Sequence, residues 1–272
     1  MSLLQQAQSP FGHVWRQLRQ EPLTLAIIVL LAGAGWGFAE LADEVTDGDT
    51  HELDRSILLA LRNADDPTDP IGPRWLEEMM RDFTALGGIS VMVILTVTAV
   101  VYLAIDRRLA MAFAVLLAVA GGFLLSLALK SGFDRPRPDL VPHGSIVYTR
   151  SFPSGHSMTA TIVYLVLGAM VARVQARRAM KWFLMILAVV LSVVVGVSRV
   201  YLGVHWPTDV LAGWAAGAGW ALAWWLVITK VRDYLKSKHT PESEAIASEL
   251  EADEEEVAKE EALAAQKRKS AT

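Results

Sequence analysis

The chain has 272 residues, of which 53% are hydrophobic and 20% are charged, and its mean hydropathy is +0.35. This balance is typical of a polytopic membrane protein and not of a soluble domain. The absence of cysteine excludes disulfide bridges, thiolate metal sites and a thiol nucleophile. The net charge of -4 conceals acidic residues gathered in the C-terminal tail and basic residues in short loops, and nothing supports nucleic-acid binding.

Six apolar segments approach the length of a membrane-spanning helix, which needs about 20 residues to cross a hydrocarbon core of about 30 Å. These segments are residues 23–42, 87–105, 109–129, 155–171, 182–197 and 207–229. The sequence therefore predicts an all-α fold, a polytopic membrane protein with six transmembrane helices.

Basic residues in the loops predict the orientation, because they accumulate on the cytoplasmic side. In a six-helix arrangement, one face receives Arg16 and Arg19, Arg107 and Arg108, residues 173–181 and residues 230–238. Both termini are therefore predicted to be cytoplasmic. The non-cytoplasmic face receives residues 43–86, 130–154 and 198–205. Short loops and a compact chain favour a bacterial plasma (inner) membrane.

The segment between the first two spans has apolar residues at positions 53, 57, 58 and 61, a helical spacing. It predicts an amphipathic helix lying at the membrane interface. The acidic stretch "DDPTDP" further along has the residue types of a cation site, but proline-broken acidic turns are usually solvated loops, and we favour that interpretation.

Three parts of the chain are predicted to differ in role. Residues 1–109 form an N-terminal segment with the first two transmembrane helices and the outer amphipathic loop. Residues 110–229 form a core of four transmembrane helices. Residues 230–272 form a charged cytoplasmic tail whose Ala, Glu and Lys content is typical of a solvated helix or of disorder.

Three short motifs place polar residues at the ends of predicted membrane helices, all on the non-cytoplasmic face. They are "KSGFDRPRP" at 130–138, "SFPSGHS" at 151–157 and "SRVYLGVHWPTD" at 198–209. Charge at membrane depth is costly unless it is paired or faces a cavity, so it points to function. Taken singly, Lys130, Arg137 and Arg199 are more simply explained as side chains that extend to lipid headgroups. Together with two histidines and an aspartate they describe a site for a phosphoryl group.

Local signals support this interpretation. Ser154 is a good N-cap and Gly155 permits close approach of the backbone, so the free N–H groups at this helix start form an anion site with His156 in its first turn. Pro207 suits the first turn of the sixth helix, which places Asp209 within reach of His205. A carboxylate partner prepares a histidine as a nucleophile. The alternative, equally weighted, is that Asp209 balances the helix dipole and His205 is a satisfied interfacial residue.

The three motifs, in this order and at this spacing, resemble the type-2 phosphatidic acid phosphatase superfamily, and the resemblance covers about residues 110–229. It implies that His205 attacks phosphorus with Asp209 orienting it, and that His156 protonates the leaving group and then activates water. It further implies that the phosphoryl oxygens are held by Lys130, Arg137, Ser154, Gly155 and Arg199. No metal and no cofactor are expected, because fixed cations and N–H donors supply the electrostatic stabilisation.

The resemblance implies an integral-membrane lipid phosphate phosphatase that acts through a phosphohistidine. Phosphatidic acid, phosphatidylglycerol phosphate, undecaprenyl pyrophosphate and lipid A phosphates are all open as substrates. Two alternatives remain: a lipid phosphotransferase with the same phosphohistidine, and a non-catalytic protein that binds or transports a lipid phosphate. No pattern in the sequence indicates an oligomeric state.

Overall fold

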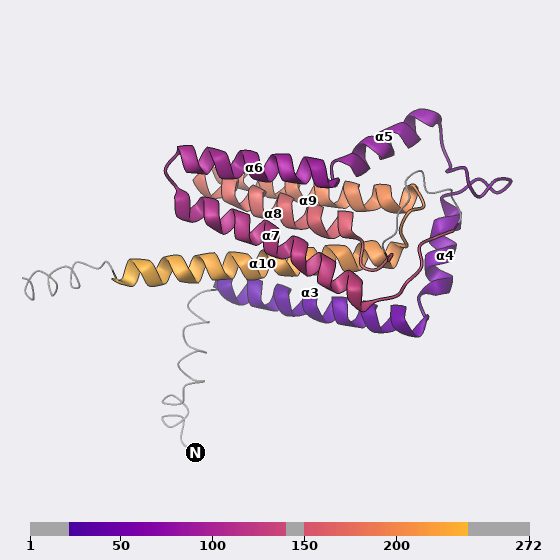
Figure 1. Cartoon of the computed structure of the whole chain (residues 1–272), viewed down its shortest axis with the longest axis horizontal. Coiled ribbons are helices and arrows are strands. Elements are labelled where there is room, and N and C mark those ends of the chain that lie inside the picture. Colours follow the sequence, from indigo (N-terminus) through magenta and orange to yellow (C-terminus); the bar gives the residue numbers. More distant parts are fainter. Residues whose placement is uncertain (1–21, 140–149, 239–272) are drawn as a thin grey trace, which may run out of the picture. The chain divides into compact units, whose positions relative to one another are not determined.

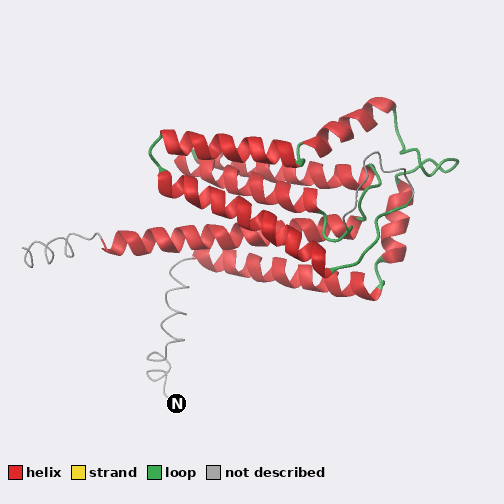
Figure 2. Ribbon diagram, in the orientation of Figure 1, coloured by secondary structure: helices red, strands yellow, loops and turns green. Residues whose placement is uncertain are grey.

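The computed structural model describes residues 22–139 and 150–238, and these residues form helices and loops without a strand (Figure 2). The helices are α3 (Pro22–Asp47), α4 (His51–Ala60), α5 (Arg74–Ala85), α6 (Ile89–Ile105), α7 (Leu109–Gly132), α8 (Gly155–Val174), α9 (Arg178–Tyr201) and α10 (Pro207–Lys238). The prediction of an all-α fold is confirmed. Arg16, Arg19 and the tail beyond residue 238 lie outside the described residues.

Five of the described helices, α3, α7, α8, α9 and α10, are long and apolar enough to span a membrane. The remaining predicted span, residues 87–105, corresponds to α6, which has 17 residues and meets this criterion only when joined to α5 across a bend of 47°. The protein is therefore a multi-pass membrane protein, and the count of six spans stays a prediction. So does the division into residues 1–109, 110–229 and 230–272. The described residues up to Leu226 form one compact unit, and α10 from Val227 onward belongs to a second.

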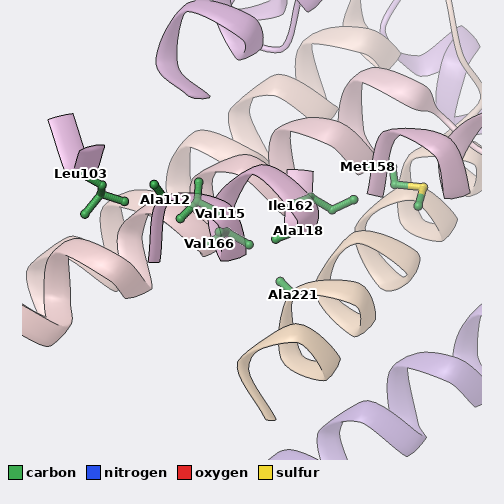
Figure 3. Close-up of a cluster of buried hydrophobic side chains, with 8 residues drawn as sticks. All are labelled: Leu103, Ala112, Val115, Ala118, Met158, Ile162, Val166 and Ala221. Atoms are coloured by element: carbon green, nitrogen blue, oxygen red, sulfur yellow. The ribbon is translucent and has the colours of Figure 1, made fainter. Parts of the chain in front are cut away.

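Within the first unit, α8 is the central helix and contacts α6, α7 and α9 (Figure 1). One core cluster joins α6, α7, α8 and α10 (Figure 3). Its buried residues are Leu103, Ala112, Val115, Ala118, Met158, Ile162, Val166 and Ala221. Alanines at these contacts let helices approach closely, which matters in lipid because apolar side chains gain little by leaving an apolar solvent.

The helix α4 confirms that the segment is helical, and its position at the membrane interface stays a prediction. Leu53 and Ile57 are 58% and 40% exposed, whereas Leu58 and Asp54 are fully buried. Leu58 packs with Val200, Trp206 and Val210 at the α9–α10 turn. The helix therefore packs against the membrane helices through a face that carries a carboxylate.

In the acidic loop after α4, Asp66 accepts hydrogen bonds from the backbone N–H and the hydroxyl of Thr68 at 2.9 and 2.7 Å. These bonds within the turn are typical of a solvated acidic loop.

Two glycines allow α10 to begin directly after α9 and close to the start of α8. Gly203 adopts a φ of 69°, and the N–H groups of Gly203 and Val204 bond the carbonyls of Val200 and Arg199 at 2.9 and 3.1 Å, which ends α9 in a tight turn. Gly213 lies against the start of α8, because a Cβ atom there would come within 2.8 Å of the Ser154 carbonyl oxygen. The starts of α8 and α10 consequently lie side by side.

Candidate active site

The predicted site residues come from four segments that meet at one end of the helices. They are Lys130 at the end of α7, Arg137 in the following loop, Ser154, Gly155 and His156 at the start of α8, Arg199 at the end of α9, and His205 and Asp209 around the start of α10. The positive charges of Lys130, Arg137 and Arg199 lie close enough to His156 to interact electrostatically with its imidazole ring. Those of Arg137 and Arg199 interact in the same way with His205. The structure thus brings the predicted residues together.

His205 and Asp209 form a buried pair. His205 Nδ1 lies 3.1 Å from Asp209 Oδ2, and their side chains are 1% and 0% exposed. The other ring nitrogen, Nε2, lies 3.0 Å from Arg137 Nη1. Because a guanidinium can only donate, Nε2 must accept, so the ring proton sits on Nδ1 and is donated to Asp209. The lone pair of Nε2 therefore faces the cations.

The protonation state of His205 follows from its surroundings. Burial lowers the pKa of His205 to about 3; the hydrogen bond to Asp209 opposes this, and the charges of Arg199 and Arg137 reinforce it. The imidazole is thus neutral at pH 7, and its Nε2 carries no proton.

The three cations are held by neighbouring oxygen atoms of the protein. Lys130 Nζ donates to the Arg150 carbonyl at 3.0 Å, and Arg137 Nη1 donates to the Val204 carbonyl at 2.8 Å. Arg199 Nη1 donates to the Thr84 hydroxyl at 3.0 Å. Buried polar groups are nearly always hydrogen-bonded, yet Arg199 Nε is buried without a partner among the described residues. An anion between these cations would give that donor an acceptor.

The start of α8 completes the cationic site. Ser154 is the N-cap, and its side chain accepts from the Ser157 N–H at 3.4 Å and from the Ser157 hydroxyl at 2.9 Å. A Cβ atom at Gly155 would lie 3.0 Å from Lys130 Cε, so glycine lets the lysine approach the N–H groups of this helix. Fixed cations and helix N–H donors therefore surround His156 on α8.

Sequence reasoning missed several residues that hold Asp209. Arg135 Nη1 donates to Asp209 Oδ1 at 2.7 Å, and the Ser151 hydroxyl and the Trp206 N–H donate to Oδ2, the latter at 3.0 Å. Arg135 and Ser151 lie inside the motifs that drew attention to the site. Asp54 on α4 has no such signal, although it shares Arg135 with Asp209.

Comparisons with known proteins show the family to which this chain is related. The model of the PAP2 superfamily matches residues 109–233. Phosphatidylglycerophosphatase B of Bacillus subtilis is 40% identical over 146 residues, which cover 53% of this chain and 70% of that protein. Undecaprenyl-diphosphatase of Sulfolobus acidocaldarius is 41% identical over 68 residues, 25% of this chain and 29% of the relative.

A solved structure extends the likeness beyond these segments. The crystal structure of a transmembrane PAP2-type phosphatidylglycerolphosphate phosphatase from Bacillus subtilis superposes with a TM-score of 0.65 at 30% identity. The superposition covers 74% of this chain and 96% of that one. The fold and the match to the superfamily model define a phosphoric-ester hydrolase embedded in a membrane. The chain belongs to the PAP2 superfamily.

Proposed function

We propose that the protein is an integral-membrane lipid phosphate phosphatase that passes the phosphoryl group to His205 Nε2 and then to water. The observation that carries this proposal is the orientation of His205. Its Nδ1, which carries the ring proton, lies 3.1 Å from Asp209 Oδ2, and its Nε2, which carries the lone pair, lies 3.0 Å from Arg137 Nη1. A nucleophile needs this arrangement, whereas a passive interfacial histidine does not.

In the first step, the Nε2 lone pair attacks phosphorus and the bond to the leaving oxygen breaks. Protonated His156 gives its proton to that oxygen, and Asp209 balances the positive charge that develops on His205. In the second step, His156 takes a proton from water as the water oxygen attacks phosphorus. The bond between phosphorus and Nε2 then breaks, and His205 returns to its neutral form.

The phosphoryl oxygens are stabilised by Lys130, Arg137 and Arg199, with the hydroxyl of Ser154 and the backbone N–H of Gly155. These groups are fixed before substrate arrives, so they stabilise the charge of the transition state without reorganisation. Three cations around one phosphoryl group supply the charge that magnesium supplies in other phosphoryl-transfer sites. We therefore infer that hydrolysis needs no metal, and that activity persists with a chelator present.

We infer that the substrate is a phosphomonoester or pyrophosphate of a membrane lipid. Two relatives described above are named as a phosphatidylglycerophosphatase and an undecaprenyl-diphosphatase. In addition, a cavity of about 310 Å³ between α6, α7 and α8 is lined almost wholly by apolar side chains. Its lining includes Thr159, one helical turn beyond His156. Such a cavity suits an acyl or prenyl chain whose headgroup lies among the cations.

We propose that the site faces the non-cytoplasmic side of a bacterial plasma membrane and that both termini are cytoplasmic. Because the chain has no cysteine, single cysteines report the orientation directly. Asp65→Cys in the exposed loop after α4 should react with an impermeant thiol reagent in intact cells. Lys181→Cys, exposed near the start of α9, should react only after lysis. The reverse labelling pattern would overturn this orientation.

The proposed activity is tested by phosphate release from the purified protein and from His205→Gln, with chelator present. The substrates are phosphatidic acid, phosphatidylglycerol phosphate and undecaprenyl pyrophosphate. We expect release by the wild type alone. Equal release by His205→Gln would contradict the phosphohistidine. Binding of these lipids without release would favour a carrier, and a phosphorylated lipid or sugar product would favour phosphoryl transfer.

A further inference from the structure

The carboxylate of Asp54 is fully buried on α4, where its two oxygens bind the start of α10. Oδ1 accepts the N–H of Thr208 at 2.9 Å, and Oδ2 accepts the Thr208 hydroxyl at 2.6 Å. Thr208 is the second residue of α10, so its N–H has no partner within the helix. Asp54 therefore caps α10 from a different helix.

Arg135 joins this carboxylate to the catalytic pair. Its Nη2 lies 2.5 Å from Asp54 Oδ2, and its Nη1 lies 2.7 Å from Asp209 Oδ1. Nη1 also donates to the Thr208 hydroxyl at 2.8 Å, and the guanidinium lies 5.6 Å from the centre of the Trp206 ring. The Arg135 side chain is only 10% exposed. One buried guanidinium is thus shared between two buried carboxylates.

We propose that Asp54 is a positioning residue of the active site, which acts through Arg135 and Thr208 to hold Asp209 in the orientation that His205 requires. This inference rests on the proposed role of His205 as nucleophile. Asp54 lies outside residues 109–233, where the superfamily model matches. The outer segment between α3 and α6 would then be part of the catalytic apparatus and not only a connection between membrane helices.

Two physical effects support this role. The planar fork of Arg135 fixes the plane of the Asp209 carboxylate, so that Oδ1 faces the guanidinium and Oδ2 faces His205. The negative charge of Asp54 also offsets part of the positive potential that Arg135 creates at Asp209 and His205. Without Asp54, this positive potential would be uncompensated, and the His205 imidazole would become less basic and a weaker nucleophile.

A purely structural role for Asp54 can be distinguished from the proposed one by comparing the activities of single and double variants in which Arg135 and Asp54 lose their charges. Arg135→Met leaves two buried carboxylates without their cation, and this should lower activity most. Adding Asp54→Asn to that variant removes one of the two repelling charges. If the charges act on catalysis, the double variant should be more active than Arg135→Met alone. If Asp54 only supports packing, the second substitution should lower activity further.

The experiment measures kcat, inhibition by inorganic phosphate, and melting temperature for the full-length protein in detergent. The variants are Asp54→Asn, Arg135→Met, both together, and His205→Gln. Glu52→Gln, an exposed residue on the same helix, is the matched control for loss of a carboxylate charge. We expect Asp54→Asn to lower kcat about 10- to 100-fold, as partners that orient a functional side chain from outside often do. Inhibition by phosphate should not change, because Lys130 and Arg199 are untouched.

The double variant should regain about 2- to 100-fold in kcat over Arg135→Met, the range of coupling within one ion-pair network. The proposal is overturned if Asp54→Asn matches Glu52→Gln, or if the double variant is no more active than Arg135→Met. Retained phosphate release by His205→Gln would overturn the proposed function itself, whatever Asp54 does.

Thr208→Val provides a second route if Asp54→Asn does not fold. It removes the hydroxyl that lies between Asp54 and Arg135 and leaves every charge in place. A fall in kcat with unchanged inhibition by phosphate is expected. Activity equal to that of the wild type would overturn the role of this network.

Discussion

The contact between α8 and α10 at Gly213 can be tested by adding one methyl group. In Gly213→Ala, the new Cβ atom would lie 2.8 Å from the Ser154 carbonyl oxygen and 3.0 Å from Ser157 Cβ. Ordinary van der Waals contact begins at 3.4 Å, so the two helices must move apart by about 0.6 Å. Both close neighbours belong to the start of α8 and cannot swing away as the end of a long side chain would.

This movement separates the two halves of the proposed site. Ser154 N–H donates to the Asp209 carbonyl at 2.9 Å, which ties the start of α8, with His156, to the start of α10. Overpacking of this kind costs about 1–3 kcal/mol in stability. Since a 1 Å displacement of catalytic groups can cost about 100-fold in rate, we expect roughly a tenfold loss of kcat/KM. The assay is phosphate release from a lipid phosphate, together with the melting temperature in the same detergent.

Gly219→Ala is the matched control on the same helix. A Cβ atom there would make ordinary contacts of 3.6 and 3.8 Å with Ala34 and Leu31 of α3. Alanine also favours the helix by about 1 kcal/mol over glycine, so this variant should melt at the same or a higher temperature and keep its activity. If Gly213→Ala matches Gly219→Ala in both measurements, the close packing of α8 on α10 is wrong.

Three further predictions concern the catalytic pair and a phosphate-binding arginine. Asp209→Asn should lower kcat by about 10⁴-fold, because both carboxylate oxygens accept from donors, Oδ1 from Arg135 and Oδ2 from His205, and an amide NH2 group fits neither position. The lowered pKa of His205 means that below pH 6.5 the unfolded chain binds a proton that the folded protein does not. The free energy of unfolding therefore decreases as the pH is lowered. By pH 5 this loss reaches about 2 kcal/mol, and His205→Gln should lack it when melting temperatures are compared between pH 7 and 5. Thr84→Val removes the acceptor that holds Arg199 at 3.0 Å, and should weaken competitive inhibition by inorganic phosphate about fivefold.

Each of these predictions has a contrary result. Asp209→Asn with more than about a tenth of wild-type kcat would mean that the carboxylate does not orient His205. Identical pH dependence of melting in the wild type and His205→Gln would mean that His205 is not held neutral by burial. Unchanged phosphate inhibition in Thr84→Val would mean that Arg199 does not contact the phosphoryl group or needs no support from α5.

Much of the site follows from local sequence signals. The starts of α8 and α10 lie where Ser154 and Pro207 predict them, because an N-cap and a first-turn proline are decided by a few neighbouring residues. The spacing of four positions between His205 and Asp209 places the two side chains within reach of each other, although the sequence alone leaves open whether they pair. The apolar runs likewise locate the membrane helices, since span length is set by the bilayer.

The support around the site does not follow from such signals. Arg135 and Asp54 are 81 positions apart, and nothing near either residue indicates the other. The spacing of apolar residues 53, 57, 58 and 61 predicts a helix in this segment. It does not predict that Asp54 is buried while Leu53 is exposed. That outcome depends on a cation brought from the loop after α7. Burial of a carboxylate is a property of the assembled helices, so only the structure reveals it.

The most direct test of the account is to trap the phosphoryl group on the protein. An aryl phosphate with a good leaving group needs no acid in the first step, so His156→Gln should form the phosphoenzyme but fail to hydrolyse it. With ³²P-labelled substrate and rapid quenching in alkali, we predict an acid-labile label on the peptide that contains His205, and none in His156→Gln/His205→Gln. Release of phosphate without a labelled protein, or a label on another residue, would contradict His205 as the nucleophile.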